Sequence, residues 1–155
     1  MSLEIDLQHE QVIHLDISNF IQVDSGTSVK DTVEQMRTTD HNCAIITKDN
    51  ALIGIFTDRD LLRKVVDAPD TWDAPIDNVM TTSPITVAAN RPAYEALDLM
   101  DKEHFRNVPV VASSGKVIGN LTHHAIIKYL AGRFPESVYN LPPQPNQVSE
   151  KRGGA

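Results

Sequence analysis

The chain has 155 residues, of which 41% are hydrophobic, and it carries a formal net charge of −7. This composition supports one ordinary domain, or two small halves with a shared core, and it excludes a disordered chain. The acidic balance argues against a protein that binds the phosphate backbone of nucleic acids.

The N-terminal residues 1–14 are expected to form an extension ahead of the repeated part of the chain, and they lack the apolar core of a signal peptide. No apolar run approaches the length needed to span a membrane. The single cysteine, Cys43, excludes an internal disulfide. A cytoplasmic location is therefore the default expectation.

Most of the chain is an internal repeat. The segment Ile21-Gln22-Val23 matches Ile85-Thr86-Val87 at an offset of 64 residues, and the offset becomes 65 by the pair Gly54 and Gly119. Self-similarity at a fixed spacing indicates a duplicated structural unit. We predict a first repeat at 15–67, a linker at 68–78 and a second repeat at 79–131.

The pattern in the first repeat predicts the order β-α-β-β-α. Val29, Val33 and Met36 fall on one face of a helix. A Lys48-Asp49-Asn50 turn joins two β-rich runs. The predicted elements are a strand at 20–23, a helix that includes 29–36, strands at 43–47 and 51–56, and a helix at 58–66.

The second repeat shows the same order. Ala93, Ala96, Leu97 and Met100 lie on one helical face, and Pro92 suits the first turn of that helix. The predicted elements are strands at 84–87, 108–112 and 116–121, with the second helix of the repeat at 123–130. Between the repeats, residues 67–77 are expected to cross the surface, held by Trp72, and residues 132–155 are expected to form a flexible, Pro-rich tail.

Three motifs together resemble the CBS domain: GIFTDRD at 54–60, MTTSPITV at 80–87 and RNVPVV at 106–111. Two such domains in tandem resemble a CBS pair, or Bateman module. The resemblance implies an α+β fold with two β-α-β-β-α repeats packed sheet to sheet in pseudo-two-fold symmetry. It also implies two clefts that bind AMP, ADP, ATP or S-adenosylmethionine, regulation of an unidentified partner protein without catalysis, and a homodimer.

The residues of the first motif suit a nucleoside ligand. Gly54 permits close approach of a backbone or a flat ring. Thr57 can cap the following helix or donate to a ligand oxygen. The Asp60 carboxylate matches two neighbouring ribose hydroxyls, and Arg59 can neutralise phosphate at the helix N-terminus, although Asp58 opposes a high phosphate charge.

Thr57 and Asp60 also match a capping box, which is the structural alternative to a ligand role. The second repeat keeps Thr122 but has Ala125 where Asp60 stands. Because that helix is expected to form without the carboxylate, the comparison favours a ligand role for Asp60. It predicts one competent cleft and one that is weakened or empty.

Resemblance to the gamma subunits of AMP-activated kinase extends the site to matching positions in both repeats. Arg106, His41 and His124 have an ordinary alternative as surface or partly buried side chains, and Ile85 is expected to belong to the core in either case. Cys43 is expected to be a buried small hydrophobe. The candidate ligand-binding residues are Thr57, Asp60, Ile55, Arg59, Ile85, Arg106, Asn107, His124 and His41.

Three classes of function remain after this comparison. A sensor of an adenosine-containing ligand ranks first. A protein-interaction module that binds nucleotide weakly or not at all ranks second, motivated by the spacing of Pro142 and Pro145 in the tail. An enzyme ranks last, because the chain has no Walker loop, dinucleotide fingerprint or nucleophile motif, and no metal site is predicted.

Overall fold

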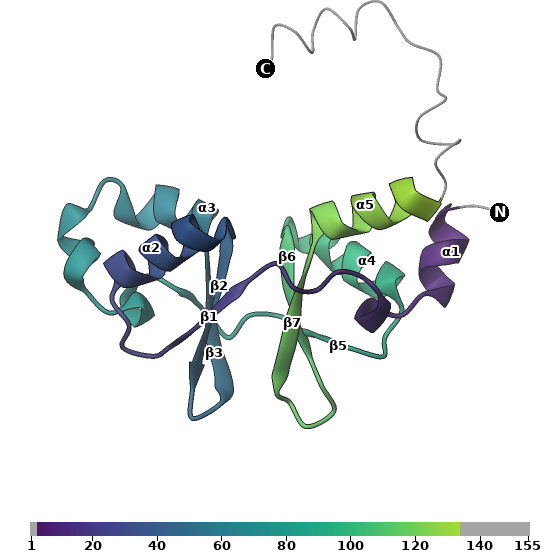
Figure 1. Cartoon of the computed structure of the whole chain (residues 1–155), viewed down its shortest axis with the longest axis horizontal. Coiled ribbons are helices and arrows are strands. Elements are labelled where there is room, and N and C mark those ends of the chain that lie inside the picture. Colours follow the sequence, from purple (N-terminus) through teal and green to yellow (C-terminus); the bar gives the residue numbers. More distant parts are fainter. Residues whose placement is uncertain (1–2, 134–155) are drawn as a thin grey trace, which may run out of the picture.

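The computed structural model describes residues 3–133 and confirms the predicted β-α-β-β-α order in both repeats (Figure 1). The first repeat contains β1 (Ile21–Asp24), α2 (Val29–Thr39), β2 (Cys43–Lys48), β3 (Ala51–Thr57), α3 (Asp58–Asp60) and the π-helix η2 (Leu61–Val65). The second contains β5 (Val87–Ala88), α4 (Ala93–Glu103), β6 (Asn107–Val111), β7 (Val117–Thr122) and α5 (His123–Arg133). Outside this order lie α1 (Leu3–His9), β4 (Thr81–Thr82) and the 3-10 helices η1 (Val12–His14), η3 (Pro69–Asp73) and η4 (Ile76–Asn78).

The two sheets pack face to face, as the resemblance implied. The first sheet has the strand order β1-β2-β3-β4 and the second has β5-β6-β7. In each sheet the first strand pairs in parallel with the second, and the second forms an antiparallel hairpin with the third. Cys43, Ile45 and Ile55 of the first sheet form one apolar cluster with Val117 of the second. Figure 1 shows the sheets at the centre, with helices on both outer sides.

The helices cover the outer faces through the residues that the periodicity selected. Val29 and Met36 of α2 are buried against the first sheet, and Ala93, Ala96 and Met100 of α4 are buried against the second. Strand β2 is consequently buried on both faces over most of its length. A continuous apolar run such as CAII at 43–46 is typical of a strand between two packed layers.

The duplication extends to details of the backbone. Helices α2 and α4 both end at a residue in the left-handed conformation, Asp40 with φ 57° and His104 with φ 59°. Strands β2 and β6 both shift register just before their hairpin turns, between 46 and 47 and between 110 and 111. The repeats therefore share their irregular features as well as their helices and strands.

A short segment ahead of each repeat crosses to the sheet of the other repeat. Thr81–Thr82 form β4, which pairs with β3 of the first sheet. Ser18 forms an isolated parallel bridge with Asn120 of the second sheet. Each crossing segment packs one side chain on a strand glycine: Met80 on Gly54 and Ile17 on Gly119. The close approach predicted at Gly54 is thus made by a neighbouring segment of the same chain.

The two glycines differ in how much space a methyl group would find. A Cβ at Gly54 would first meet the Sδ atom of Met80, at the flexible end of that side chain, whereas a Cβ at Gly119 would lie 2.7 Å from the Cβ of Ile17. We expect Gly119→Ala to lower the free energy of unfolding by about 1–3 kcal/mol, because Ile17 cannot rotate its own Cβ away. Gly54→Ala is the matched control and should cost less than about 1 kcal/mol. Denaturant unfolding of both variants measures the difference, and equal losses would contradict it.

The linker is more than a surface crossover. Trp72 is 37% exposed, whereas Ile76 is fully buried in the core of the first repeat. Hydrogen bonds from the Ser25 hydroxyl (2.5 Å) and the Gly26 N–H (2.7 Å) reach Asp77 and lower the pKa of its carboxyl. The buried anchor of the linker is therefore Ile76, and the expectation that Trp72 holds the linker stays a prediction.

The N-terminal residues pack on the second repeat. Leu7, Val12 and Leu15 belong to the same buried cluster as α4 and α5. The Tyr129 hydroxyl of α5 donates to Asp6 at 2.7 Å, and burial together with this bond raises the pKa of Tyr129. The division into an extension, two repeats and a linker at the stated residues stays a prediction.

Within residues 3–133, no helix is both long and apolar enough to cross a bilayer. Helix α5 continues three residues past its predicted end, to Arg133. The rest of the predicted tail, with its Pro142 and Pro145 spacing, lies outside the described residues.

Candidate functional site

The start of α3 places Asp60 in a nearly closed environment. Thr57 ends β3 and is the N-cap of α3. Its backbone N–H donates to Asp60 Oδ2 at 3.0 Å, and its hydroxyl approaches the same oxygen at 3.4 Å. Asp60 is only 9% exposed. The carboxylate therefore closes a capping box, which was the structural alternative raised by the sequence.

The second carboxylate oxygen has partners that the sequence did not suggest. Asp60 Oδ1 accepts from the Thr81 hydroxyl at 3.1 Å and pairs with Lys64 Nζ at 3.1 Å. Lys64 also donates to the carbonyl oxygen of Val79 at 3.0 Å. A carboxylate offers about four lone-pair sites, and four donors surround this one. Asp60 thus connects α3 and η2 to the crossing segment that leads into the second repeat.

The second repeat shows that a helix forms at this point without a carboxylate. There the hydroxyl of Thr122 accepts the Ala125 N–H at 2.9 Å, an ordinary N-cap bond. Helix α5 then runs for 11 residues, whereas α3 has three residues and passes into a π-helix. The carboxylate is therefore not a general requirement of the repeat, and single-turn π distortions often occur at functional sites.

Backbone hydrogen bonds attach the start of each of these helices to the loop before the second strand of its own repeat. The Asp58 N–H donates to the Asn42 carbonyl at 3.2 Å, and the His123 N–H donates to the Arg106 carbonyl at 2.9 Å. These two bonds occupy matching positions in the repeats. They bring α3 beside the loop that carries His41, and α5 beside Arg106.

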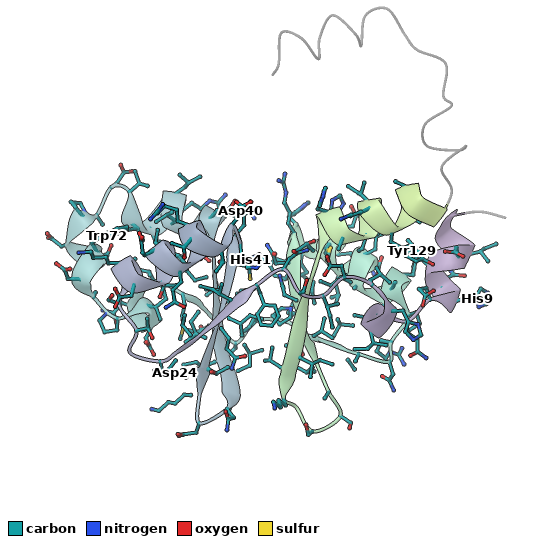
Figure 2. All side chains as sticks on the ribbon, viewed as in Figure 1. His9, Asp24, Asp40, His41, Trp72 and Tyr129 are labelled. Carbon is teal, nitrogen blue, oxygen red and sulfur yellow. The ribbon has the colours of Figure 1, made fainter. Side chains whose placement is uncertain are left out.

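Arg59 connects the two repeats directly. Its guanidinium donates to the His104 carbonyl at 3.3 Å, so that the first turn of α3 contacts the end of α4. His41 is half-buried, and Figure 2 shows it where the two repeats face each other. His124 and Arg106 are exposed. The four basic candidate residues thus lie on loops and helix ends at the same end of the strands.

The apolar candidates have different positions. Ile55 is 7% exposed and belongs to the cluster between the sheets. Ile85 is 41% exposed, so the expectation that it belongs to the core was wrong. The strand predicted at 84–87 is reduced to Val87–Ala88, since residues 81–82 pair with the other sheet instead. Ile85 is left between these two pairings.

Asn107 is the first residue of β6, and its Oδ1 accepts from Asn120 Nδ2 at 3.1 Å. Sequence reasoning missed Asn120 and the two partners of Asp60, Thr81 and Lys64. Two signals were available: Lys64 follows Asp60 by one helical turn, and Asn120 stands where the first repeat has Ile55. The role of Thr81 depends on a crossing between sheets that has no local signature.

Cys43 is buried as predicted, and burial together with the charges of Asp60 and Asp58 raises the pKa of its thiol.

In the described part of the chain, no group of three or more His, Cys, Asp and Glu side chains could hold a metal ion. An open hollow of about 360 Å³ lies at the opposite end of the strands, lined by Asp49, Asn50, Ala51, Ser114, Gly115 and Lys116. It contains none of the candidate residues.

Comparison with known proteins identifies both repeats. The family model described as CBS domain matches residues 12–67 and again 76–132. Among curated proteins, the CBS domain-containing protein CBSCBSPB5 of Arabidopsis thaliana is 33% identical over 112 residues, which cover 71% of this chain and 20% of the relative. The chain spans 20% of the length of this relative and 31% of the length of the similar protein MJ1232 of Methanocaldococcus jannaschii.

Solved structures agree with the family model. The CBS domain structure NE2398 is 26% identical, with a TM-score of 0.71, and the match covers 77% of this chain and 96% of that one. The structure of CBSX2 from Arabidopsis thaliana in complex with AMP is 27% identical, with a TM-score of 0.68 and coverage of 79% and 97%.

Proposed function

Because the chain belongs to the CBS domain family, we propose that it is a regulatory module that binds an adenosine-containing ligand and modulates a partner protein. The ligand class is AMP, ADP, ATP or S-adenosylmethionine. The observation that carries the proposal is the nearly buried Asp60 carboxylate at the start of α3, which the second repeat replaces with Ala125. The AMP complex of the similar protein CBSX2 supports the choice of ligand class.

A ribose at Asp60 would have to exchange hydrogen bonds with existing partners. Two neighbouring hydroxyls need two acceptor positions, and the four donors around Asp60 already occupy the carboxylate. The Thr57 N–H is part of the backbone cap, whereas the Thr81 hydroxyl and the Lys64 ammonium can move away. We infer that ligand binding releases these two groups. Release would loosen β4 and Val79, and so couple the ligand to the contact between the repeats.

The basic side chains supply the second half of the proposed site. Arg59, His41, Arg106 and His124 are the basic side chains that would face a phosphate group, in a chain whose formal net charge is −7. Arg59 would exchange the His104 carbonyl for a phosphate oxygen, which is the stronger, charge-assisted acceptor. The ribose would thus be held by the first repeat, and the phosphate by both.

Titration calorimetry tests the proposal. The chain is titrated with AMP, ADP, ATP, NAD and S-adenosylmethionine in turn, and we expect saturable heat with at least one adenosine-containing ligand below roughly 1 mM. The stoichiometry should be one per chain, since only one repeat has the carboxylate. Absence of heat with every ligand would refute the sensor function.

The alternative is an interaction or oligomerisation module with little nucleotide binding. Leu62 and Val66 are 67% and 59% exposed, and Ile127 of α5 is 50% exposed. Leu62 and Ile127 occupy matching positions in the two repeats, 65 residues apart. Figure 1 shows α3 and α5 at the same end of the sheets. Exposed large apolar side chains at the same end of the two sheets favour a protein contact, and we propose a homodimer through this face.

We also propose that the protein acts in the cytoplasm, by regulation and not by catalysis. We propose that the regulated partner is a second protein.

A further inference from the structure

Asn120 is a fully buried polar residue at a position where the first repeat has the apolar Ile55. Its Oδ1 has no hydrogen-bond partner in the described part of the chain. A buried acceptor oxygen without a hydrogen bond destabilises the folded state. Where a folded protein keeps such a group, it often serves a function. A leucine or isoleucine would satisfy the packing alone, as Ile55 does.

The hydrogen bonds of Asn120 determine how a second amide is oriented. Asn120 Nδ2 donates to the Asn19 carbonyl at 3.1 Å and to Asn107 Oδ1 at 3.1 Å. A backbone carbonyl can only accept, so the Asn120 atom that faces it must be the amino nitrogen. Since the same nitrogen faces Asn107, that residue must present its oxygen to Asn120. The orientation of both amides therefore follows from one backbone group.

Asn107 consequently has its amino group free of this network. The residue is half-buried at the start of β6 and follows the exposed Arg106. The Arg106 carbonyl is held by His123, and the adjoining turn is held by Arg59 through the His104 carbonyl. The segments that these bonds join carry the basic side chains of Arg59 and Arg106 and the acidic side chain of Asp58, and Asp16 lies close enough to His41 for the two to interact. An amino group that can only donate, next to two guanidinium groups, suits an anionic acceptor.

We propose that Asn120 is a positioning residue that fixes Asn107 with its amino group toward the ligand, so that Asn107 donates to a phosphoryl oxygen. This inference rests on the proposed function, and it adds that the ligand carries a phosphoryl group that Asn107 recognises. Asn120 does not touch the ligand. It acts through Asn107, and its effect should appear in the preference for AMP over adenosine.

Calorimetry with AMP and adenosine tests the role of Asn107. Asn107→Asp keeps an oxygen toward Asn120 but replaces the free amino group with a second, charged oxygen. We expect AMP affinity to fall about tenfold or more, and adenosine affinity to change less than about threefold. Asn107→Ala should lower the affinity for AMP by a smaller factor and leave the affinity for adenosine unchanged. Equal losses for the two ligands in both variants would overturn the phosphoryl contact.

A double-variant cycle tests whether Asn120 acts through Asn107. Asn120→Leu removes the orienting donor and the unpaired oxygen together, but it also removes the bond to the Asn19 carbonyl, so denaturant unfolding is measured to establish that the variant is folded. We expect its loss of AMP affinity to vanish in the background of Asn107→Ala, because the two residues act in series. Additive losses would overturn the positioning role.

Side-chain amide NMR of the unmodified protein gives a readout independent of affinity. The Asn120 amino protons should exchange slowly with water, and those of Asn107 rapidly until AMP is added. Slow exchange at Asn107 without ligand would refute the free amino group. If the unmodified protein bound adenosine but did not prefer AMP, this inference would fail and the proposed function would stand. If neither ligand bound, both would fail.

Discussion

Asp60→Ala is expected to lower the affinity for the adenosine-containing ligand by roughly 5- to 150-fold. The loss corresponds to about 1–3 kcal/mol for ribose hydroxyls left without their charged acceptor. The substitution also removes the capping bond to Thr57 and the partner of Lys64. A separate loss of about 0.5–2 kcal/mol in the free energy of unfolding should accompany it.

The two effects can be separated by a milder change. Asp60→Asn keeps an oxygen for the Thr57 N–H, so it should preserve most of the stability and still weaken binding, because a neutral oxygen accepts less strongly. Asp24→Asn is the matched control, since it removes the same charge at the exposed end of β1 (Figure 2). Calorimetry and denaturant unfolding are measured on all three. Full affinity in Asp60→Asn and Asp60→Ala would show that the carboxylate only caps the helix.

Leu62→Glu combined with Ile127→Glu is expected to convert the proposed homodimer to monomer. Each side chain contributes about 1.5–3 kcal/mol when it is buried in an interface, and a carboxylate in the same place adds an unpaired charge. In a two-fold dimer every substitution counts twice. The dissociation constant should rise by at least about 100-fold. Light scattering coupled to size exclusion measures the mass directly.

Ile13→Glu supplies the matched control for this face. Ile13 is 40% exposed in η1, a helix that carries neither Leu62 nor Ile127, so the same change in charge and size should leave the dimer intact. A monomer in the unmodified protein at micromolar concentration would refute the interface. Dimer loss in Ile13→Glu alone would place the interface on another face.

Local pattern was sufficient for most of the secondary structure. The helical faces of α2 and α4 and the hairpins β2–β3 and β6–β7 depend on residues close in sequence, whose periodicity is visible in the chain. The errors concern residues whose partners are distant. Ile76, which the pattern did not single out, is the buried side chain of the linker, and Ile85 is exposed because the preceding threonines pair with the other sheet.

The candidate site divides in the same way. Thr57 and Asp60 are three residues apart, so the sequence could pose both a capping and a ligand role, and the capping contact is present. The contacts from Thr81 and Lys64 engage the second oxygen of the Asp60 carboxylate in the absence of ligand, and they could not be predicted from the local sequence. Asn120 looked like an ordinary strand residue, since nothing local shows that the Asn19 carbonyl, 101 residues away, orients its amide.

By itself, the sequence determined the duplication, the order of elements in each repeat, the family and the difference between Asp60 and Ala125. Only the tertiary structure decided that each repeat sends a short segment to the sheet of the other, with Met80 on Gly54 and Ile17 on Gly119. The physical reason is that a repeat of this size cannot bury both faces of its sheet alone. Which segment covers each face of a sheet depends on packing between residues that are distant in the sequence. The periodicity of apolar residues along the chain does not predict such packing.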